Sequence, residues 1–250
     1  MKIKISLAFI TIYFLFLVGT IPASLIKPFI PKQTGLQFED ISGTLWNGKL
    51  SNVVYDNKYR IKELTWKMDW LALTSLKIKA NVEFNNGRKA LLGVGAVAYS
   101  FTGVAVSDVN IDMQATELLP YLQLPVPVTP SGKLTLVIEN GVPGDPYCQE
   151  LDGYLVWHGA RIDTPMGNID LSNPNIDLSC GNGDLIASLK QNSEQLTTNA
   201  SVALKKGGYF QVEGNIMGHQ KLDPSILQAI AWIGPKNAKG ETPFNYKGRL

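Results

Sequence analysis

Histidine and cysteine are scarce in this chain of 250 residues, which holds two of each. A zinc site would need more ligands than His158, His219 and the cysteines readily provide. Neither an HExxH motif nor a GxSxG nucleophile elbow is present. Pairs of acidic residues such as Glu150 and Asp152 occupy the polar positions of alternating runs. Their place on a solvent-exposed sheet face is enough to explain them. We therefore expect no metal centre, no cofactor and no enzymatic activity.

An excess of charge of either sign is also missing. The formal net charge is +2, and two of the basic residues, Lys2 and Lys4, stand at the N-terminus; without them the chain holds 21 basic and 21 acidic residues. A nucleic-acid binder normally carries a basic patch and a high pI, and no such cluster occurs here. Nucleic acid is not an expected partner.

One short glycine-containing stretch resembles part of a nucleotide-binding motif. Residues 43–49 read GTLWNGK, which matches a P-loop through its lysine. The next position requires Ser or Thr for magnesium and holds Leu50, and a helix should follow. Val53, Val54 and Tyr55 continue like a strand instead, so we expect no nucleotide site.

The N-terminus contains a long uncharged run from Ile5 to Ile26. About 20 consecutive apolar residues allow a helix to cross a bilayer, and Lys2 and Lys4 favour a cytoplasmic N-terminus. The sequence therefore predicts a cytoplasmic tail (1–4), a single transmembrane helix (5–26) in the inner membrane, and a periplasmic body.

A cleavable signal peptide is the alternative. Its apolar region spans about 7–15 residues and ends in small residues. The run here is longer, and cleavage after Ala23 would put Ile21 where a small residue is needed. We favour the uncleaved anchor, and the body is exported in either case.

Most of the body alternates apolar and polar residues with a period of two, which is typical of strands with one dry face. Such alternation belongs to antiparallel sheets, and glycine- and asparagine-rich turns separate the runs. The sequence predicts an all-β fold with an extended antiparallel sheet. The alternating apolar positions include Leu64, Trp66, Met68 and Trp70; Leu76, Ile78, Ala80, Val82 and Phe84; and Ile176, Leu178 and Cys180.

Two interruptions of this pattern are expected. Asp223, Pro224 and Ser225 give an N-cap and a first-turn proline for a short C-terminal helix that ends at Gly234. The proline-rich stretch 120–130 cannot be a central strand. We place there a boundary between a first β half (27–122) and a second β half (131–250), or a bend in one continuous sheet.

The apolar strand faces exceed what so few helices can cover. They either close on each other as a sandwich or barrel, or line a groove that a ligand or partner fills. A closed core is the more common solution, and both remain open at this point.

The two cysteines, Cys148 and Cys180, suit a disulfide in an oxidising compartment. Closing a loop of that length stabilises a fold by roughly 3–4 kcal/mol in the chain-entropy model. Two free buried thiols are the alternative. We expect the disulfide, because Cys148 follows a turn and Cys180 ends a strand-like run.

A short sequence element occurs in similar form in both halves, which indicates either a duplication or a chance repeat. We call its two copies the echo elements. The first element, GTLWNG, is similar to the later GYLVWHG, which has one inserted residue. The residues that the two elements have in common are Gly43, Leu45, Trp46 and Gly48 in the first element and Gly153, Leu155, Trp157 and Gly159 in the second.

Taken together, the order of these features resembles protein N of the bacterial type II secretion system over nearly the whole length. The likeness rests on the N-terminal anchor, the SGTLWNGK stretch, GKLTL at 132–136, the GYLVWHGA stretch with a cysteine on each side, and the terminal GRL. The GTLW element alone also occurs in AsmA-like envelope proteins, so the cysteine spacing makes the match more specific.

This resemblance implies a non-enzymatic accessory or scaffold component that supports export of folded proteins across the outer membrane. Its implied partners are inner-membrane subunits of the apparatus and the outer-membrane secretin. The resemblance transfers no catalytic residue, only the signature element. The rival function is an AsmA-like envelope protein that handles lipid in an apolar groove.

Overall fold

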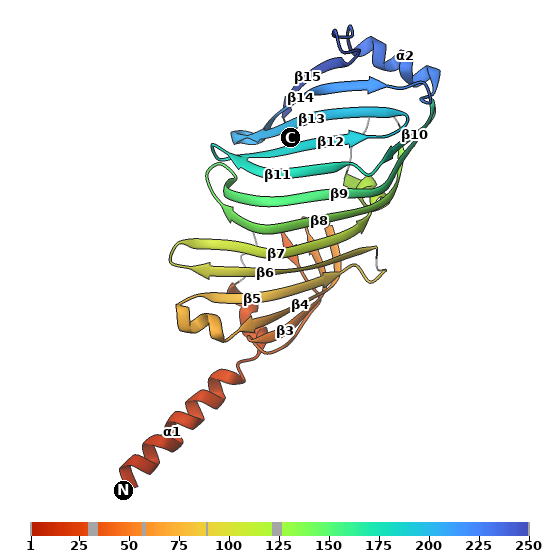
Figure 1. Ribbon diagram of the computed structural model, residues 1–250. Coiled ribbons are helices and arrows are strands. Elements are labelled where there is room, and N and C mark those ends of the chain that lie inside the picture. Colours follow the sequence, from red (N-terminus) through yellow and green to blue (C-terminus); the bar gives the residue numbers. More distant parts are fainter. Residues whose placement is uncertain (1, 30–34, 57–58, 89, 122–126, 250) are drawn as a thin grey trace. The chain divides into compact units, whose positions relative to one another are not determined.

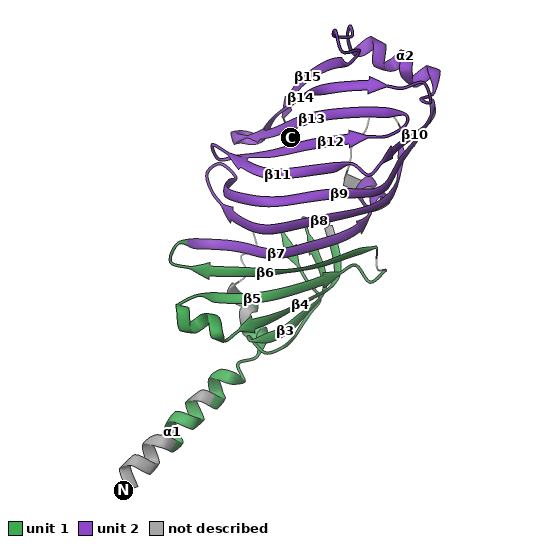
Figure 2. Ribbon diagram, viewed as in Figure 1, with its two compact units in different colours: residues 1–102 green, residues 103–250 purple. Residues whose placement is uncertain are grey.

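The computed structural model describes residues 2–29, 35–56, 59–88, 90–121 and 127–249 (Figure 1). The chain forms two compact units, unit 1 (residues 1–102) and unit 2 (residues 103–250) (Figure 2). Met1 of the expected tail and residues 122–126 at the expected boundary lie outside the described residues. The division into halves at 27–122 and 131–250 stays a prediction.

Unit 1 begins with a helix and continues as an antiparallel sheet in the order β1-β3-β4-β5-β6, with β2 also paired to β3. Its elements are α1 (Lys2–Gly19), the 3₁₀ helix η1 (Ala23–Phe29), β1 (Leu36–Gln37), β2 (Asp40–Gly43), β3 (Asn47–Tyr55), β4 (Tyr59–Asp69), the 3₁₀ helix η3 (Leu71–Ser75), β5 (Ile78–Asn85) and β6 (Leu91–Ser100).

The N-terminal helix α1 covers the first part of the predicted anchor, and η1 covers its end. Within the stretches of chain that the structure describes, no helix combines the length and the apolar character needed to cross a membrane.

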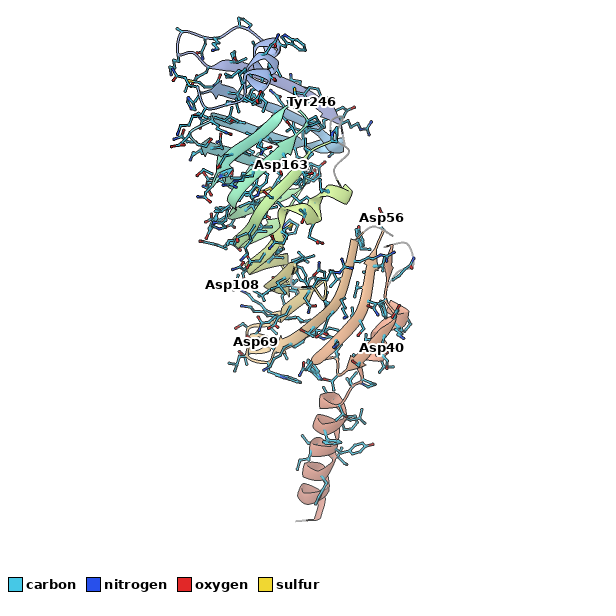
Figure 3. The ribbon with its side chains drawn as sticks, turned by 90° about the vertical axis from the view of Figure 1, so that its right-hand side faces the viewer. Asp40, Asp56, Asp69, Asp108, Asp163 and Tyr246 are labelled. Atoms are coloured by element: carbon cyan, nitrogen blue, oxygen red, sulfur yellow. A yellow bond between two sulfur atoms is a disulfide. The ribbon has the colours of Figure 1, made fainter. Side chains whose placement is uncertain are left out.

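The strands of unit 1 run between two distinct ends. Asp69 ends β4 close to the β2–β3 turn, whereas Asp56 lies in the β3–β4 turn at the other end (Figure 3). We call the end that carries Asp69, the β2–β3 turn and the start of β3 the helix end, because the segment that follows α1 bonds to it there. The opposite end is the far end.

Unit 2 contains a longer antiparallel sheet in the order β7-β8-β9-β11-β12-β13-β14-β15, with β10 paired to β9. Its elements are β7 (Gly103–Gln114), the 3₁₀ helix η4 (Ala115–Tyr121), β8 (Thr129–Pro143), β9 (Cys148–Thr164), β10 (Gly167–Ser172), β11 (Asn175–Gly181), β12 (Asp184–Asn192), β13 (Leu196–Lys205), the 3₁₀ turn η5 (Lys206–Gly208), β14 (Tyr209–Gly218), α2 (Pro224–Ile233) and β15 (Thr242–Arg249).

The C-terminal helix α2 forms where the sequence predicts it. Asp223 caps its N-terminus by accepting a hydrogen bond from the Ser225 N–H at 2.8 Å, and Pro224 occupies the first turn. Ile226 and Ile230 on its inner face are buried with Leu196 and Leu222. This cluster is a small core at one end of unit 2.

The predicted antiparallel, mostly β architecture is therefore confirmed. Outside the α2 cluster, however, the apolar face of unit 2 is only half-buried on β11 to β14, although Leu134 on β8 is buried. The residues of this face align in cross-strand rows on β11 to β14: Ile176, Leu189, Ala200 and Gly214; Leu178, Ala187, Val202 and Val212; and Cys180, Leu185, Leu204 and Phe210. In the part of the chain that the structure describes, no second sheet covers these rows.

Candidate functional site

The signature element GTLWNG forms the tight turn between β2 and β3. The Thr44 N–H donates to the carbonyl oxygen of Asn47 at 2.9 Å, and the Asn47 N–H donates to Thr44 Oγ1 at 3.1 Å. Gly43 adopts φ +83°, and a Cβ there would lie 2.5 Å from the Asn47 oxygen. Only glycine fits both the conformation and the space.

Gly48 makes room for an aromatic ring on the neighbouring strand. It pairs directly with Trp66 of β4, and a Cβ on Gly48 would lie 2.2 Å from the Trp66 ring. The indole Nε1 of Trp66 donates to the carbonyl oxygen of Leu45 at 2.9 Å. The ring thus covers the glycine and holds the turn in place.

Trp46 joins this turn to the N-terminal helix. Its Nε1 donates at 2.7 Å to the carbonyl oxygen of Val18 in the last turn of α1, which also accepts from the Ile21 N–H at 3.4 Å. Its ring stacks on Trp70 with centroids 4.0 Å apart. The Leu45 N–H donates to the carbonyl oxygen of Ile21 at 2.8 Å.

The chain after α1 is therefore fixed to the sheet by a backbone and a side-chain bond. An isolated bridge between Pro22 and Thr44 continues the contact, and Ala23 is fully buried. We call this assembly the helix junction; it comprises residues 18–23, the turn 43–48, Trp66 and Trp70. It is the best-defined candidate site in unit 1.

The P-loop interpretation has no support at this turn. Lys49 belongs to β3, and its Nζ lies 2.7 Å from Glu63 Oε2 on β4. The segment continues as a strand up to Tyr55, as the sequence predicts, and no helix follows to face a phosphate.

The second element occupies the middle of β9 in unit 2 rather than a turn. Trp157 Nε1 donates to the carbonyl oxygen of Ser131 at 3.0 Å. A Cβ on Gly153 would lie 2.6 Å from the carbonyl oxygen of Val137, so the glycine allows close strand pairing. Gly159 has φ +58°, and its N–H donates to Asn173 Oδ1 at 2.9 Å.

Leu155 of the same element pairs with Leu136 and Ile176 on the adjacent strands. Both echo elements thus use an indole N–H to bind a backbone carbonyl. Among the residues that the structure describes, the first element also bonds to the end of α1.

The predicted disulfide between Cys148 and Cys180 is present. It joins the start of β9 to β11. The neighbouring Tyr147 adds hydrogen bonds to a third turn, the one between β13 and β14. The Tyr147 hydroxyl donates to the carbonyl oxygen of Lys205 at 3.1 Å and accepts from the Gly208 N–H at 3.0 Å. Three hairpin turns of unit 2 are therefore fastened together at one end.

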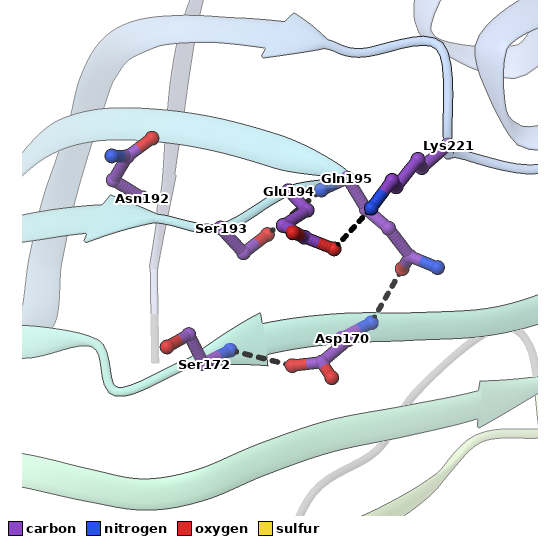
Figure 4. A pocket seen from close by; sticks show the side chains of 7 residues that line it. All are labelled: Asp170, Ser172, Asn192, Ser193, Glu194, Gln195 and Lys221. Carbon is purple, nitrogen blue, oxygen red and sulfur yellow. Dashed lines mark hydrogen bonds and ion pairs between the residues drawn. The ribbon is translucent and has the colours of Figure 1, made fainter.

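A polar notch of about 550 Å³ opens elsewhere in unit 2 (Figure 4). The N–H of Asp170 on β10 donates to Gln195 Oε1 at 2.6 Å, and Lys221 Nζ lies 2.6 Å from Glu194 Oε2. Arg161 faces the Asp170 carboxylate at 3.6 Å. The Asp170 bond connects β10 to the β12–β13 turn, the Lys221 pair connects that turn to the segment after β14, and the Arg161 pair connects β9 to β10. The notch therefore has a structural explanation.

Two carboxylates have lowered pKa values because lysines bond to them. The hydrogen bond from Lys133 Nζ at 2.9 Å, with one from Thr135, lowers the pKa of Asp112. The hydrogen bond from Lys190 at 3.0 Å lowers the pKa of Asp177. Both groups are ionised at neutral pH, which suits ion pairing rather than general acid catalysis.

The histidines do not form part of a metal cluster. His219 Nε2 lies 2.8 Å from Thr197 Oγ1, within hydrogen-bonding distance. Among the described residues, no group of three or more histidine, cysteine or acidic side chains is placed to hold a metal ion.

Sequence reasoning did not predict that residues 18–23, Trp66 and Trp70 join the signature turn. In the sequence Val18 belongs only to the apolar run, and Trp70 only to an alternating strand. The stretch after Trp70, with its unusual density of leucines before Lys77, is the available signal that this strand ends in something other than a solvated turn.

Comparison with known proteins gives one consistent result. Residues 34–245 match the family model described as type II secretion system (T2SS), protein N. The chain is 30% identical to a type II secretion system protein N of Aeromonas hydrophila, over 100% of this chain and 99% of that protein. It is 26% identical to the protein of that name in Vibrio cholerae serotype O1, over 98% and 97%, and 25% identical to that of Pectobacterium carotovorum, over the full length of both. No solved structure matches the chain significantly.

Proposed function

Because this chain belongs to the type II secretion system protein N family, we propose that it is a non-enzymatic scaffold of that apparatus, anchored in the inner membrane by its N-terminal helix with both β units in the periplasm. The helix junction is the observation that carries this proposal. It binds the end of α1 to the sheet through Trp46 and Leu45, so a force or an orientation fixed at the helix is transmitted to unit 1.

The exposure of α1 supports an anchor. Phe9, Ile12 and Phe16 share one face of the helix and Phe14 lies on the opposite side, and all four are more than 60% exposed. A helix that is apolar all round is not stable in water by itself and belongs in a core or a bilayer. The lysines at its start favour a cytoplasmic N-terminus.

The disulfide supports the periplasmic placement of unit 2. Disulfides persist in oxidising compartments such as the bacterial periplasm and are rare in the cytosol. The bond between Cys148 and Cys180 closes a loop in unit 2, so that unit belongs on the oxidising side.

Fractionation of cells that express the full chain tests the anchor. We expect the wild type and Ile12→Leu to resist alkaline extraction from the membrane. Ile12→Arg adds an insertion cost of about 2.5–3.5 kcal/mol and should release protein or prevent its accumulation. Equal extraction of all three, or cysteines that react with a thiol reagent without prior reduction, would contradict the proposal.

Partner binding is proposed to occur at the open edge of unit 2. Within the described part of the chain, β15 pairs with β14 alone, so its other edge presents unpaired backbone groups. Such an edge can add a strand from a partner. Other subunits of the apparatus, including inner-membrane subunits and the secretin, are the proposed partners.

Photo-crosslinking tests the edge. A photoreactive amino acid at Tyr246 of β15 should give adducts with other secretion components. The same probe at Lys190, an exposed position on the internal strand β12, is the control. Adducts from neither position, or equally from both, would count against an edge-specific contact.

Deletion of the gene should stop exoprotein secretion while the envelope stays impermeable.

The half-buried apolar rows of unit 2 favour a second candidate function, the handling of lipid. They align across four strands, and no second sheet lies over them among the described residues. Lipid extraction from the purified chain separates the candidates. Phospholipid in near-equal amount to protein favours lipid handling, and its absence favours the scaffold.

A further inference from the structure

The helix end of unit 1 carries an unusual concentration of exposed apolar side chains. Leu71 and Leu76 beside η3 are 79% and 71% exposed, and Phe101 in the turn after β6 is 91% exposed. Trp70, Leu73 and Tyr99 are also exposed. We call these six residues the apolar rim.

Strand register places the rim at one end of the sheet. Asp69, the last residue of β4, pairs with Lys79, and Ile78, the first residue of β5, pairs with Tyr99 near the end of β6. The segments that follow β4 and β6 therefore lie at the same end. The start of β3 pairs with Lys67 of β4, so the signature turn is at this end as well.

The turns at the far end of unit 1 have the opposite character, and the exposed apolar residues there, Tyr55 and Leu92, lie in the strands beside them. Asp56 is exposed in the β3–β4 turn, and Gly87 and Arg88 are exposed in the β5–β6 turn. Solvated hairpin turns normally have this polar composition. The apolar turns at the helix end are thus a local feature and not a general property of the unit.

The loop that carries the leucines is held in a defined conformation. The Leu71 N–H donates to Asp69 Oδ1 at 2.9 Å, and the Lys77 N–H donates to the carbonyl oxygen of Ala72 at 3.1 Å. Leu76 adopts the left-handed conformation with φ 56°. A bulky residue in this region is uncommon, and glycine or asparagine would fit with less strain. The strained backbone holds a leucine that stays exposed.

The rim is connected to the N-terminal helix by direct contacts. Trp70 stacks on Trp46, and Trp46 bonds to the Val18 carbonyl at the end of α1. If α1 spans a bilayer, the rim lies beside the point at which the chain leaves it. Tryptophan, tyrosine and flanking lysines are the residues that anchor proteins at the membrane–water interface. Lys67 and Lys77 on either side of the loop are exposed and suit phospholipid headgroups.

We propose that the apolar rim is a second membrane contact, which inserts into the headgroup region of the same bilayer that holds α1 and fixes the orientation of unit 1 against it. This inference rests on the proposed anchor. The occupant is phospholipid, because the rim adjoins the exposed apolar helix and carries lysines at its border.

Depth-dependent quenching of an attached fluorophore tests the contact. Both native cysteines are in the disulfide, so Ser75→Cys gives a single thiol in η3, and Arg88→Cys gives a matched one at the far end. The full chain, labelled with an environment-sensitive dye, is reconstituted into vesicles of phosphatidylethanolamine and phosphatidylglycerol. We expect spin-labelled lipid to quench the dye at position 75 several-fold more than the dye at position 88.

Polar substitutions then identify the side chains responsible. Leu71→Asn with Leu76→Asn should lower quenching at position 75 toward that at position 88, and asparagine tolerates the left-handed backbone at position 76. Leu92→Asn is the control, since Leu92 is the second residue of β6, at the far end, and is 42% exposed. Unchanged quenching in the double variant would overturn the proposal.

Three further results distinguish a failure of this inference from a failure of the anchor. If the vesicles float with the protein but position 75 remains unquenched, the anchor stands and the rim does not touch lipid. The rim proposal fails in the same way if position 75 becomes shielded only when other secretion subunits are added, because the rim would then bind protein. If the protein does not float with vesicles, the anchor and the rim contact both fail.

Discussion

Replacing Gly48 with alanine probes the packing of the signature turn. An added Cβ would lie 2.2, 2.5 and 2.7 Å from three carbons of the Trp66 ring. The ring cannot move away without losing the 2.9 Å bond from its Nε1 to the Leu45 oxygen. Overpacking costs about 1–3 kcal/mol, and the lost hydrogen bond adds about 1 kcal/mol. We therefore expect Gly48→Ala to lower the free energy of unfolding of unit 1 by about 2–4 kcal/mol.

The measurement has to report on unit 1 alone, because the chain has two compact units. Hydrogen exchange of the full chain across a urea series, read by mass spectrometry on peptides from β3 and β4, meets this need. At a slope of about 1–3 kcal/mol per molar urea, the midpoint of those peptides should fall by roughly 1 M or more.

Two variants decide whether the stated contact is responsible. Gly19→Ala is the control within unit 1, since an added Cβ there would meet no atom within 4 Å. In a Trp66→Leu background the ring is gone, so Gly48→Ala should cost much less there. An equal cost in both backgrounds would refute the reasoning, as would a Gly48→Ala cost no larger than that of the control.

Three further outcomes are expected. Trp46→Phe keeps a ring but removes the donor to Val18, so it should cost about 1 kcal/mol and speed amide exchange at residues 20–23; unchanged exchange there would contradict the helix junction. Replacing both cysteines by serine, which opens a loop with a sequence separation of 32, should lower the stability of unit 2 by roughly 3–4 kcal/mol, and a loss below about 1 kcal/mol would contradict the cross-link. Asp112 has a lowered folded pKa through its bond from Lys133, so its contribution is present above its ordinary value of 3.8 and is lost as pH falls through the lowered value. The half-exposed pair should therefore give wild type an advantage of about 0.5 kcal/mol over Asp112→Asn at pH 7, measured by urea unfolding, and an advantage that persisted at pH 2 would contradict this assignment.

Local signals in the sequence were sufficient for much of the fold. Alternation at Leu64, Trp66 and Met68 correctly predicted β4, because a strand with one dry face needs that period. The Asp223 cap with Pro224 correctly predicted where α2 begins, since both act through the backbone of the first turn.

Features that depend on contacts between distant residues were not predictable in this way. The bond from Trp46 to the Val18 carbonyl spans 28 positions, and no periodicity encodes it. The similarity between the two echo elements also hid a difference, because the residues around Trp157 lie within one long strand and those around Trp46 form a turn. Sequence alternation left open whether the apolar faces would close into a core, since it does not specify what lies opposite a face.

Consecutive pairing within unit 2 has a consequence for how the chain can acquire its structure. From β12 to β15 each strand hydrogen-bonds to the strand immediately before it along the chain. A polypeptide synthesised from its N-terminus delivers its segments one after another. Each new strand here can pair at once with the strand that precedes it. The entropy cost of closing the short loop between two such neighbours is small. Assembly of this sheet can therefore proceed vectorially, with the α2 helix and the final strand closing it last.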